Sequence, residues 1–242
     1  MKTMTYLLML VSFFIVGCSD NDSALSDDNF IETPSDTTTT QKNYKILALG
    51  DSYTIGESVC NACRFPEQLK DSLKTVFDTN HQIDLKVIAR TGWTTTNLIN
   101  AIATEKPSED YDLTTLLIGV NNQYQGKPFS IYENEFPQLI NTAIKHAKGD
   151  KSNVIVVSIP DYAFTPFGNG NNNISKEIDT YNNFAKAYCN NNGITFVNIT
   201  DITRMGLDNP SLVANDGLHP SALAYSKFIN RILPLASEKL KN

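Results

Sequence analysis

A serine, an aspartate and a histidine stand where they could form a nucleophilic site. Ser52 follows an apolar run in the segment Gly50-Asp51-Ser52, and Asp216 and His219 lie together near the end of the chain. A carboxylate beside an imidazole holds the ring in one tautomer and stabilises its protonated form, which allows the imidazole to activate a serine hydroxyl. These residues predict a nucleophile (Ser52), a general base (His219) and an orienting carboxylate (Asp216).

Each of these pieces also has a plain structural explanation. Gly-Asp-Ser is an ordinary turn followed by a helix cap, and Asp216 with His219 is also compatible with a helix cap beside an exposed histidine. His219 is nevertheless the only one of the three histidines with an acidic neighbour in a loop that leads into a helix. This pairing favours the catalytic interpretation.

Two further positions offer hydrogen-bond donors for a developing negative charge. Gly92 follows a second apolar run and offers a backbone N–H, and Asn121 follows a third run and offers a side-chain amide. Taken alone, a loop glycine and a turn-forming asparagine explain them equally well. Together with Ser52, whose own N–H begins a helix, they are candidates for an oxyanion hole.

The residues from Tyr44 onward alternate between short apolar runs and longer helical stretches. Expected strands are 44–49, 83–89, 113–118, 154–159 and 194–199, and expected helices are 66–77, 95–105, 131–148, 176–190 and 221–241. Such alternation predicts right-handed crossovers and a doubly wound parallel sheet in one α/β domain, 44–242. In such folds the functional crevice lies beyond the carboxyl ends of the strands, where Ser52, Gly92 and Asn121 fall.

In order and spacing, the four blocks around Ser52, Gly92, Asn121 and Asp216-x-x-His219 resemble those of the SGNH (GDSL-type) hydrolases. The resemblance runs from about Lys45 to the C-terminus. It implies a three-layer α/β/α fold with a flavodoxin-like five-stranded parallel sheet. It also implies a serine esterase that works through an acyl-enzyme without a cofactor. Its oxyanion hole would comprise the N–H groups of Ser52 and Gly92 and the amide of Asn121.

The chain departs from this family pattern at two positions. Tyr53 stands where the family usually has leucine, and we expect it to narrow the acyl side of the pocket. Asn122 stands where the third block often has aspartate, which puts the usual support of that loop in doubt.

Aromatic residues after the expected strands are candidates for substrate contacts, namely Tyr53, Trp93, Tyr124 and Phe164, and Tyr162 and Phe167 are further candidates for the walls of the cleft. Aromatic walls suit sugar rings and acyl chains equally, and packing beneath loops explains any single one as well. The expected substrate is a small acyl ester or an acylated glycan. The alternatives are a lysophospholipase or thioesterase of the same family, and a non-catalytic glycan- or ligand-binding module on the same fold.

The first residues resemble a bacterial lipoprotein signal. Lys2 precedes an eleven-residue uncharged run, Tyr6 to Val16, which ends at Gly17-Cys18. A membrane span needs about 20 apolar residues, whereas a signal-peptide core needs about 7–15. The resemblance implies that residues 1–17 are removed and that Cys18 carries lipid such as palmitate. An ordinary secretory signal or a buried N-terminal helix are the alternatives.

Residues 18–43 follow as an expected disordered tether, since they are rich in Asp, Ser and Thr and poor in large apolar groups. We therefore expect the protein in the bacterial cell envelope, lipid-anchored to the outer membrane on its periplasmic or surface face. The membrane would be contacted only through the lipid on Cys18.

The charge and the remaining cysteines exclude other classes. The net charge is −6, and six acidic residues against one basic residue lie in 19–43, so no basic footprint for nucleic acid exists. Cys60 and Cys63 form a C-x-x-C pair in an expected loop, where a local disulfide is favoured over redox chemistry. The histidines are too scattered for a zinc site. We expect no metal and a monomer.

Overall fold

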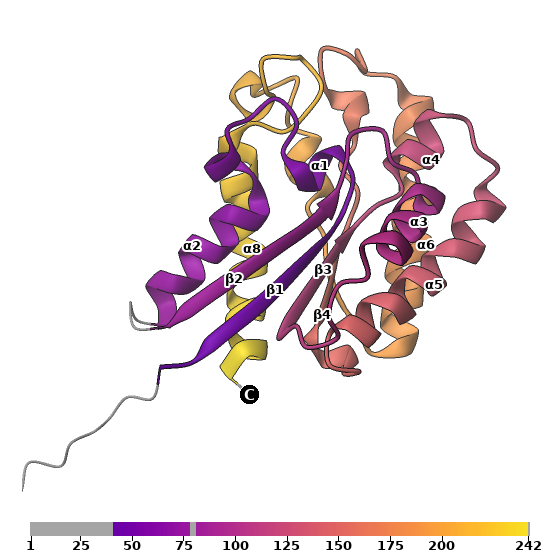
Figure 1. Cartoon of the computed structure of the whole chain (residues 1–242). Helices are drawn as coiled ribbons and strands as arrows, with labels where there is room; N and C mark the ends of the chain where they lie inside the picture. Colours follow the sequence, from indigo (N-terminus) through magenta and orange to yellow (C-terminus); the bar gives the residue numbers. More distant parts are fainter. Residues whose placement is uncertain (1–40, 78–80, 242) are drawn as a thin grey trace, which may run out of the picture. The chain divides into compact units, whose positions relative to one another are not determined.

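The protein is described by a computed structural model that covers residues 41–77 and 81–241. Five strands form one parallel sheet in the order β2-β1-β3-β4-β5 (Figure 1). They are β1 (Asn43–Gly50), β2 (Gln82–Ala89), β3 (Leu113–Leu117), β4 (Val154–Val157) and β5 (Thr195–Val197). Gly50 is in register with both Ala89 and Leu117, so β1, β2 and β3 end at one edge. The strand order reverses at β1, which creates the crevice expected of this topology.

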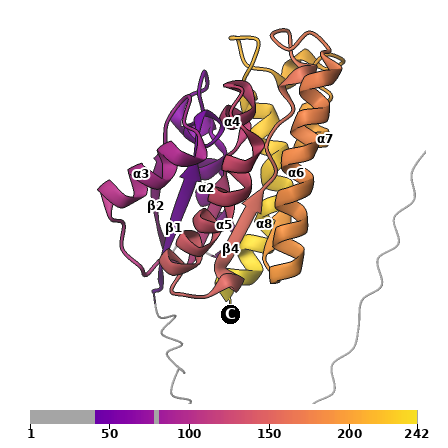
Figure 2. The same ribbon diagram turned by 90° about the vertical axis from the view of Figure 1, so that its right-hand side faces the viewer.

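Helices cover both faces of the sheet. The helices α2 (Phe65–Phe77) and α8 (Ala222–Lys241) lie on one face, and α3 (Thr95–Glu105), α5 (Phe129–His146) and α6 (Asn172–Asn192) lie on the other (Figures 1 and 2). Short helices follow three strands at their carboxyl ends: α1 (Ser52–Ile55), α4 (Val120–Tyr124) and α7 (Thr200–Thr203). The predicted three-layer α/β/α fold with a five-stranded parallel sheet is therefore confirmed.

Single 3-10 turns complete the described elements. They span Asn61–Cys63, Lys151–Asn153, Tyr162–Phe164 and Pro210–Leu212.

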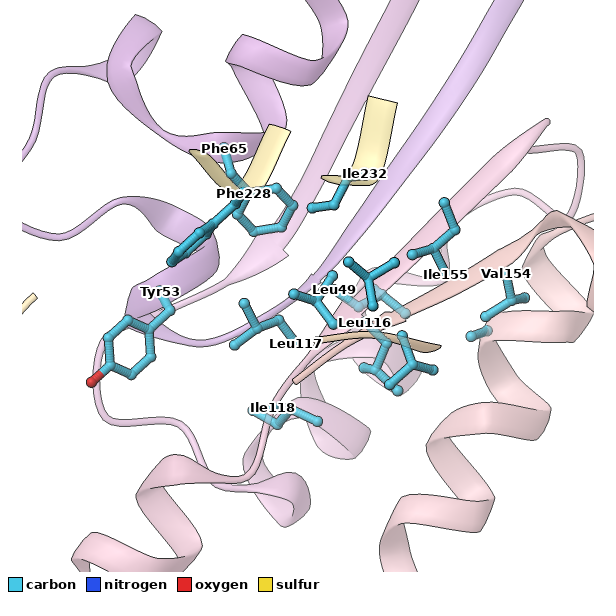
Figure 3. Packing of buried hydrophobic residues seen from close by; sticks show 14 of the residues in the cluster. Leu49, Tyr53, Phe65, Leu116, Leu117, Ile118, Val154, Ile155, Phe228 and Ile232 are labelled. Atoms are coloured by element: carbon cyan, nitrogen blue, oxygen red, sulfur yellow. The ribbon is translucent and has the colours of Figure 1, made fainter. Parts of the chain in front are cut away.

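Apolar side chains from the helices and the sheet make a continuous core. Figure 3 shows Phe65 of α2 and Phe228 and Ile232 of α8 over the sheet residues Leu49 and Leu116. All five are fully buried, and each such side chain stabilises the fold by about 1.5–3 kcal/mol relative to an exposed one. The loops at the carboxyl edge of the sheet are therefore supported by a well-packed core.

The predicted elements are all present, with shifted ends. The fourth strand ends at Val157 instead of Ile159, because the N–H of Ile159 leaves the sheet and donates to the Asn182 side chain of α6 at 2.9 Å. The chain therefore turns away from the sheet there and begins the loop that leads to Tyr162.

The predicted signal (1–17) and Cys18 lie outside the described residues, as does all of the tether (18–43) except its last three residues. The domain boundaries and the lipid anchor therefore remain predictions. Within the described ranges, no helix combines the length and apolar character needed to cross a bilayer.

Candidate active site

The turn after β1 presents Ser52 at the carboxyl edge of the sheet. Asp51 caps the short helix α1, with its Oδ1 accepting the N–H of Tyr53 at 3.0 Å. Gly50 is required for this turn, since a Cβ there would lie 2.4 Å from the carbonyl oxygen of Leu117. Ser52 is the first residue of α1, where helix N–H groups lack partners within the helix. Its side chain lines a pocket of about 190 Å³.

The loop before α8 holds Asp216 and His219 as a hydrogen-bonded pair. Oδ1 of Asp216 accepts the backbone N–H groups of Leu218 and His219, each at 2.9 Å. Oδ2 of Asp216 accepts from Nδ1 of His219 at 2.6 Å. Because Asp216 binds Nδ1, Nε2 is the nitrogen left for proton transfer. His219 is buried and lines the same pocket as Ser52.

Asp216 is held in its ionised form. Its partial burial would raise the pKa of the carboxyl, but hydrogen bonds from the Ser58 hydroxyl, from His219 and from two backbone N–H groups outweigh this and hold the pKa well below its usual range. At neutral pH a negative charge therefore faces the imidazole, as a general base that must accept a proton requires.

The structure brings Ser52 and His219 to one pocket although they are far apart in sequence. Within the described residues, the His219 side chain hydrogen-bonds to Asp216 and not to Ser52. Contacts between a nucleophile and its base often tighten only when substrate is bound. The arrangement is thus that of a serine and a histidine at one pocket, with an aspartate bound to the histidine.

The two expected oxyanion donors also line this pocket. Gly92 has a φ of 81°, and its carbonyl, in the peptide that follows the N–H, accepts from the Gln125 side chain at 2.8 Å. Nδ2 of Asn121 donates to the carbonyl of Trp93 at 3.1 Å. Because a side-chain amide carries two N–H bonds, the second remains for a ligand. The pocket therefore combines a hydroxyl, an imidazole and converging donors.

Asn122 supports the loop after β3, although the family often has aspartate at this position. It is fully buried, its Oδ1 accepts the N–H of Thr95 at 2.9 Å, and its Nδ2 donates to the Thr95 hydroxyl at 2.7 Å. The side chain thus ties α4, which carries Asn121, to the start of α3.

The structure separates the aromatic candidates into two groups. Tyr53 and Tyr124 line the pocket, and the Tyr53 ring lies 5.3 Å from the His219 ring. Trp93 and Phe164 do not line it. Trp93 packs against the core and contributes only its carbonyl to Asn121. Phe164 ends a 3-10 turn, in which side chains two positions apart point in different directions.

From the loop that carries Phe164, Tyr162 and Phe167 line the pocket instead.

Sequence reasoning missed Ser58 altogether. Its hydroxyl donates to Oδ2 of Asp216 at 2.6 Å across 158 positions of sequence. No motif marks such a contact, because a lone serine in a loop is common. The same loop contains the disulfide between Cys60 and Cys63. Across the described part of the chain, no cluster of His, Cys, Asp and Glu has the arrangement of a metal site.

Comparisons with known proteins identify a family and similar folds. Residues 48–227 match the model of the GDSL-like Lipase/Acylhydrolase family. A variant of Axe2, an acetyl xylan esterase from Geobacillus stearothermophilus, is similar in structure, with 18% identity, a TM-score of 0.62 and coverage of 81% of this chain and 95% of that one. LAE5, an alpha/beta hydrolase enzyme from the metagenome of Lake Arreo, Spain, has 20% identity, a TM-score of 0.61 and coverage of 82% and 97%.

A third similar structure is the psychrotrophic esterase EstA from Pseudoalteromonas sp., inhibited by monoethylphosphonate. It has 17% identity, a TM-score of 0.58 and coverage of 82% of this chain and 99% of that one. At these identities the solved structures establish the fold alone. No curated protein matches the chain.

Proposed function

The chain belongs to the GDSL-like lipase/acylhydrolase family, and from this premise we propose that it is a serine esterase that hydrolyses small acyl esters. The observation that carries the proposal is the shared pocket: Ser52 and His219 line it together, and His219 is bound to an ionised Asp216 behind it. This arrangement supports nucleophilic catalysis by a hydroxyl.

In the proposed first step, Oγ of Ser52 attacks the ester carbonyl carbon while Nε2 of His219 accepts the hydroxyl proton. The tetrahedral intermediate carries its negative charge on the former carbonyl oxygen. It collapses as His219 returns the proton to the departing alcohol, which leaves an acyl-serine. Water then attacks with His219 again as the base, and the acid and the free serine are released.

The N–H groups of Ser52 and Gly92 and the amide of Asn121 would bind the oxyanion. Each such donor is worth about 2.7–4 kcal/mol of transition-state stabilisation. Asp216 would hold the imidazole in the tautomer that keeps Nε2 free to accept a proton. The chemistry needs no group beyond these side chains and water.

The size of the pocket favours short acyl groups. Its volume of about 190 Å³ lies below the roughly 300–1,000 Å³ typical of small-molecule sites. Tyr53 and Val120 close it with apolar surface. An acetyl or similarly small acyl group would therefore fit better than a long chain.

A serine-reactive fluorophosphonate probe tests the proposal directly. We expect it to label Ser52 in the purified protein, with loss of labelling and of ester turnover in Ser52→Ala. Ser226→Ala, in the remote helix α8, is the matched control and should behave as the wild type. A chain that is folded but neither labelled nor active on short-chain esters would be a binding module and not an enzyme.

We also propose that Cys18 is lipidated and anchors the domain in the cell envelope, on the sequence resemblance alone. Metabolic labelling with radioactive palmitate, combined with fractionation, tests this. Cys18→Ala should lose both the label and the membrane association, and retention of the variant in membranes would reject the anchor.

A further inference from the structure

Three aromatic rings form a cluster at the mouth of the pocket. The ring of Tyr124 lies 6.0 Å from that of Tyr162 and 6.1 Å from that of Phe167, and Tyr162 and Phe167 are 6.2 Å apart. Tyr162 is buried, whereas Tyr124 and Phe167 are 56% and 53% exposed. Large aromatic surface left in water beside a reactive centre indicates a binding surface for a ligand.

The cluster is held in place before any ligand arrives. Buried Asp161 caps the turn that begins with Tyr162, and Arg204 donates to its Oδ2 at 2.9 Å. The N–H of Phe167 donates to the carbonyl of Gly217, beside Asp216, at 3.0 Å. A surface that is preorganised in this way loses little conformational entropy when a ligand binds.

A second hollow of about 310 Å³ is lined by Gln123 of α4 and by Glu177 and Tyr181 of α6. The aromatic cluster and this hollow are joined by Gln123, which accepts the Tyr162 hydroxyl at 2.8 Å. Gln123 in turn donates to Glu177 at 2.6 Å, and Lys127 also lines the hollow. Hydrogen-bonding groups of both kinds thus lie next to the aromatic rings.

Aromatic rings beside hydrogen-bonding groups fit one class of alcohol as the leaving group of the ester. A fatty chain would require continuous apolar surface, whereas here Gln123, Lys127 and Glu177 interrupt the aromatic lining that Phe129 and Tyr181 continue. A saccharide has apolar C–H faces that pack on aromatic rings and hydroxyls that pair with amides and carboxylates. We propose, building on the esterase function above, that the aromatic cluster and the second hollow bind the sugar residues of an acylated glycan on the leaving-group side of Ser52.

The test compares substrates that differ only in the alcohol: acetylated xylotetraose against ethyl acetate, with release of acetic acid followed by titration. We expect Phe167→Ala and Glu177→Gln to lower kcat/KM on the saccharide ester at least tenfold more than on ethyl acetate, chiefly through KM. Val76→Ala, an exposed apolar residue of α2, is the control and should change neither rate.

Equal losses on both substrates would overturn the subsite, since the cluster would then only shape the pocket. A loss that appears on ethyl decanoate and not on the saccharide ester would also overturn it, because the rings would then hold an acyl chain. A wild-type protein that hydrolyses neither acetate and whose Ser52 stays unlabelled would instead refute the esterase function itself.

A separate observation concerns Ser58, the partner of Asp216. Its φ is 64°, a left-handed conformation that is costly for a residue with a side chain. Its hydroxyl donates to Oδ2 of Asp216, the same oxygen that accepts from His219. Residues held in such conformations persist where surrounding contacts demand them. We infer that Ser58 is a positioning residue that fixes the Asp216 carboxylate toward His219.

The variant Ser58→Gly separates this role from a merely structural one. Glycine relieves the backbone strain, so the melting temperature should stay the same or rise, whereas loss of the hydroxyl should lower kcat about tenfold at an unchanged KM. Lys106→Gly is the matched control, because Lys106 also has a positive φ, of 44°, at the end of α3, and it should keep full activity. A Ser58→Gly protein with wild-type kcat would overturn the inference.

Discussion

The Asp51 carboxyl beside the candidate nucleophile should make the stability of this protein fall as the pH rises. It is completely buried, Oδ1 accepts the N–H of Tyr53, and Oδ2 has no partner among the described residues. Loss of hydration through burial raises the pKa of Asp51 from 3.8 to about 8. Between these two values the folded state holds a proton that the unfolded chain has released.

The size of the effect follows from this difference. Because the folded pKa is the higher one, the stabilisation is complete below about pH 4 and is lost as the pH rises toward 8. The loss amounts to about 1.4 kcal/mol per pH unit, or about 4 kcal/mol at pH 7. Asparagine carries no charge and can still accept the N–H of Tyr53. Asp51→Asn should therefore match the wild type near pH 4 and be about 4 kcal/mol more stable at pH 7.

Urea denaturation of both proteins at several values between pH 4 and pH 8 measures this difference, in which the other titrating groups cancel. Asp51→Ala is the control: it also removes the charge but loses the helix cap, which costs about 0.5–2 kcal/mol at every pH. Its free energy of unfolding should run parallel to that of Asp51→Asn and below it. A wild-type curve parallel to that of Asp51→Asn from pH 4 to pH 8 would refute the reasoning.

Further substitutions test the other contacts of the site. Asn121→Ala should lower kcat by about 10²–10³ with a smaller change in KM, measured on a short-chain ester; a change confined to KM would mean that its amide only binds substrate. Asp216→Asn should lower kcat by up to about 10⁴ through the wrong imidazole tautomer. Asp216→Asn should also make the free energy of unfolding fall less steeply in acid. Because the pKa of Asp216 is lowered in the folded state, its ionised form stabilises the fold at pH values above the ordinary carboxyl pKa, and this contribution disappears as the pH falls. Asn122→Ala should cost about 1–3 kcal/mol in urea denaturation by leaving the backbone N–H of Thr95 without its acceptor, and a loss below about 0.5 kcal/mol would show that this hydrogen bond is not needed.

Much of the fold was predictable because its signals are local. Buried parallel strands such as 154–157 are apolar throughout, and amphipathic helices such as 95–105 repeat on a 3.6-residue period, so the alternation is visible in any short window. The end of β4 could not be read from local sequence, because it depends on a hydrogen bond from the N–H of Ile159 to the side chain of Asn182 on α6.

The aromatic residues show the limit of this reasoning. Tyr162, Phe164 and Phe167 lie within six positions of one another, yet two line the pocket and one does not. Their directions depend on the 3-10 turn that Asp161 caps. Composition marks the loop as aromatic, but the backbone conformation decides which rings line the pocket.

By itself the sequence determined the alternation of strands and helices and the identity of the reactive side chains. Both are local properties, because the spacing of apolar residues and the chemical type of each side chain can be read from short stretches of sequence. Only the tertiary structure decided which groups meet, such as the Ser58 hydroxyl and Asp216, or the rings of Tyr124 and Phe167. It also decided that Oδ2 of Asp51 is buried without a partner among the described residues. Burial and contact between distant segments arise from how the layers pack, and those quantities set the charge of a carboxyl and the shape of a pocket.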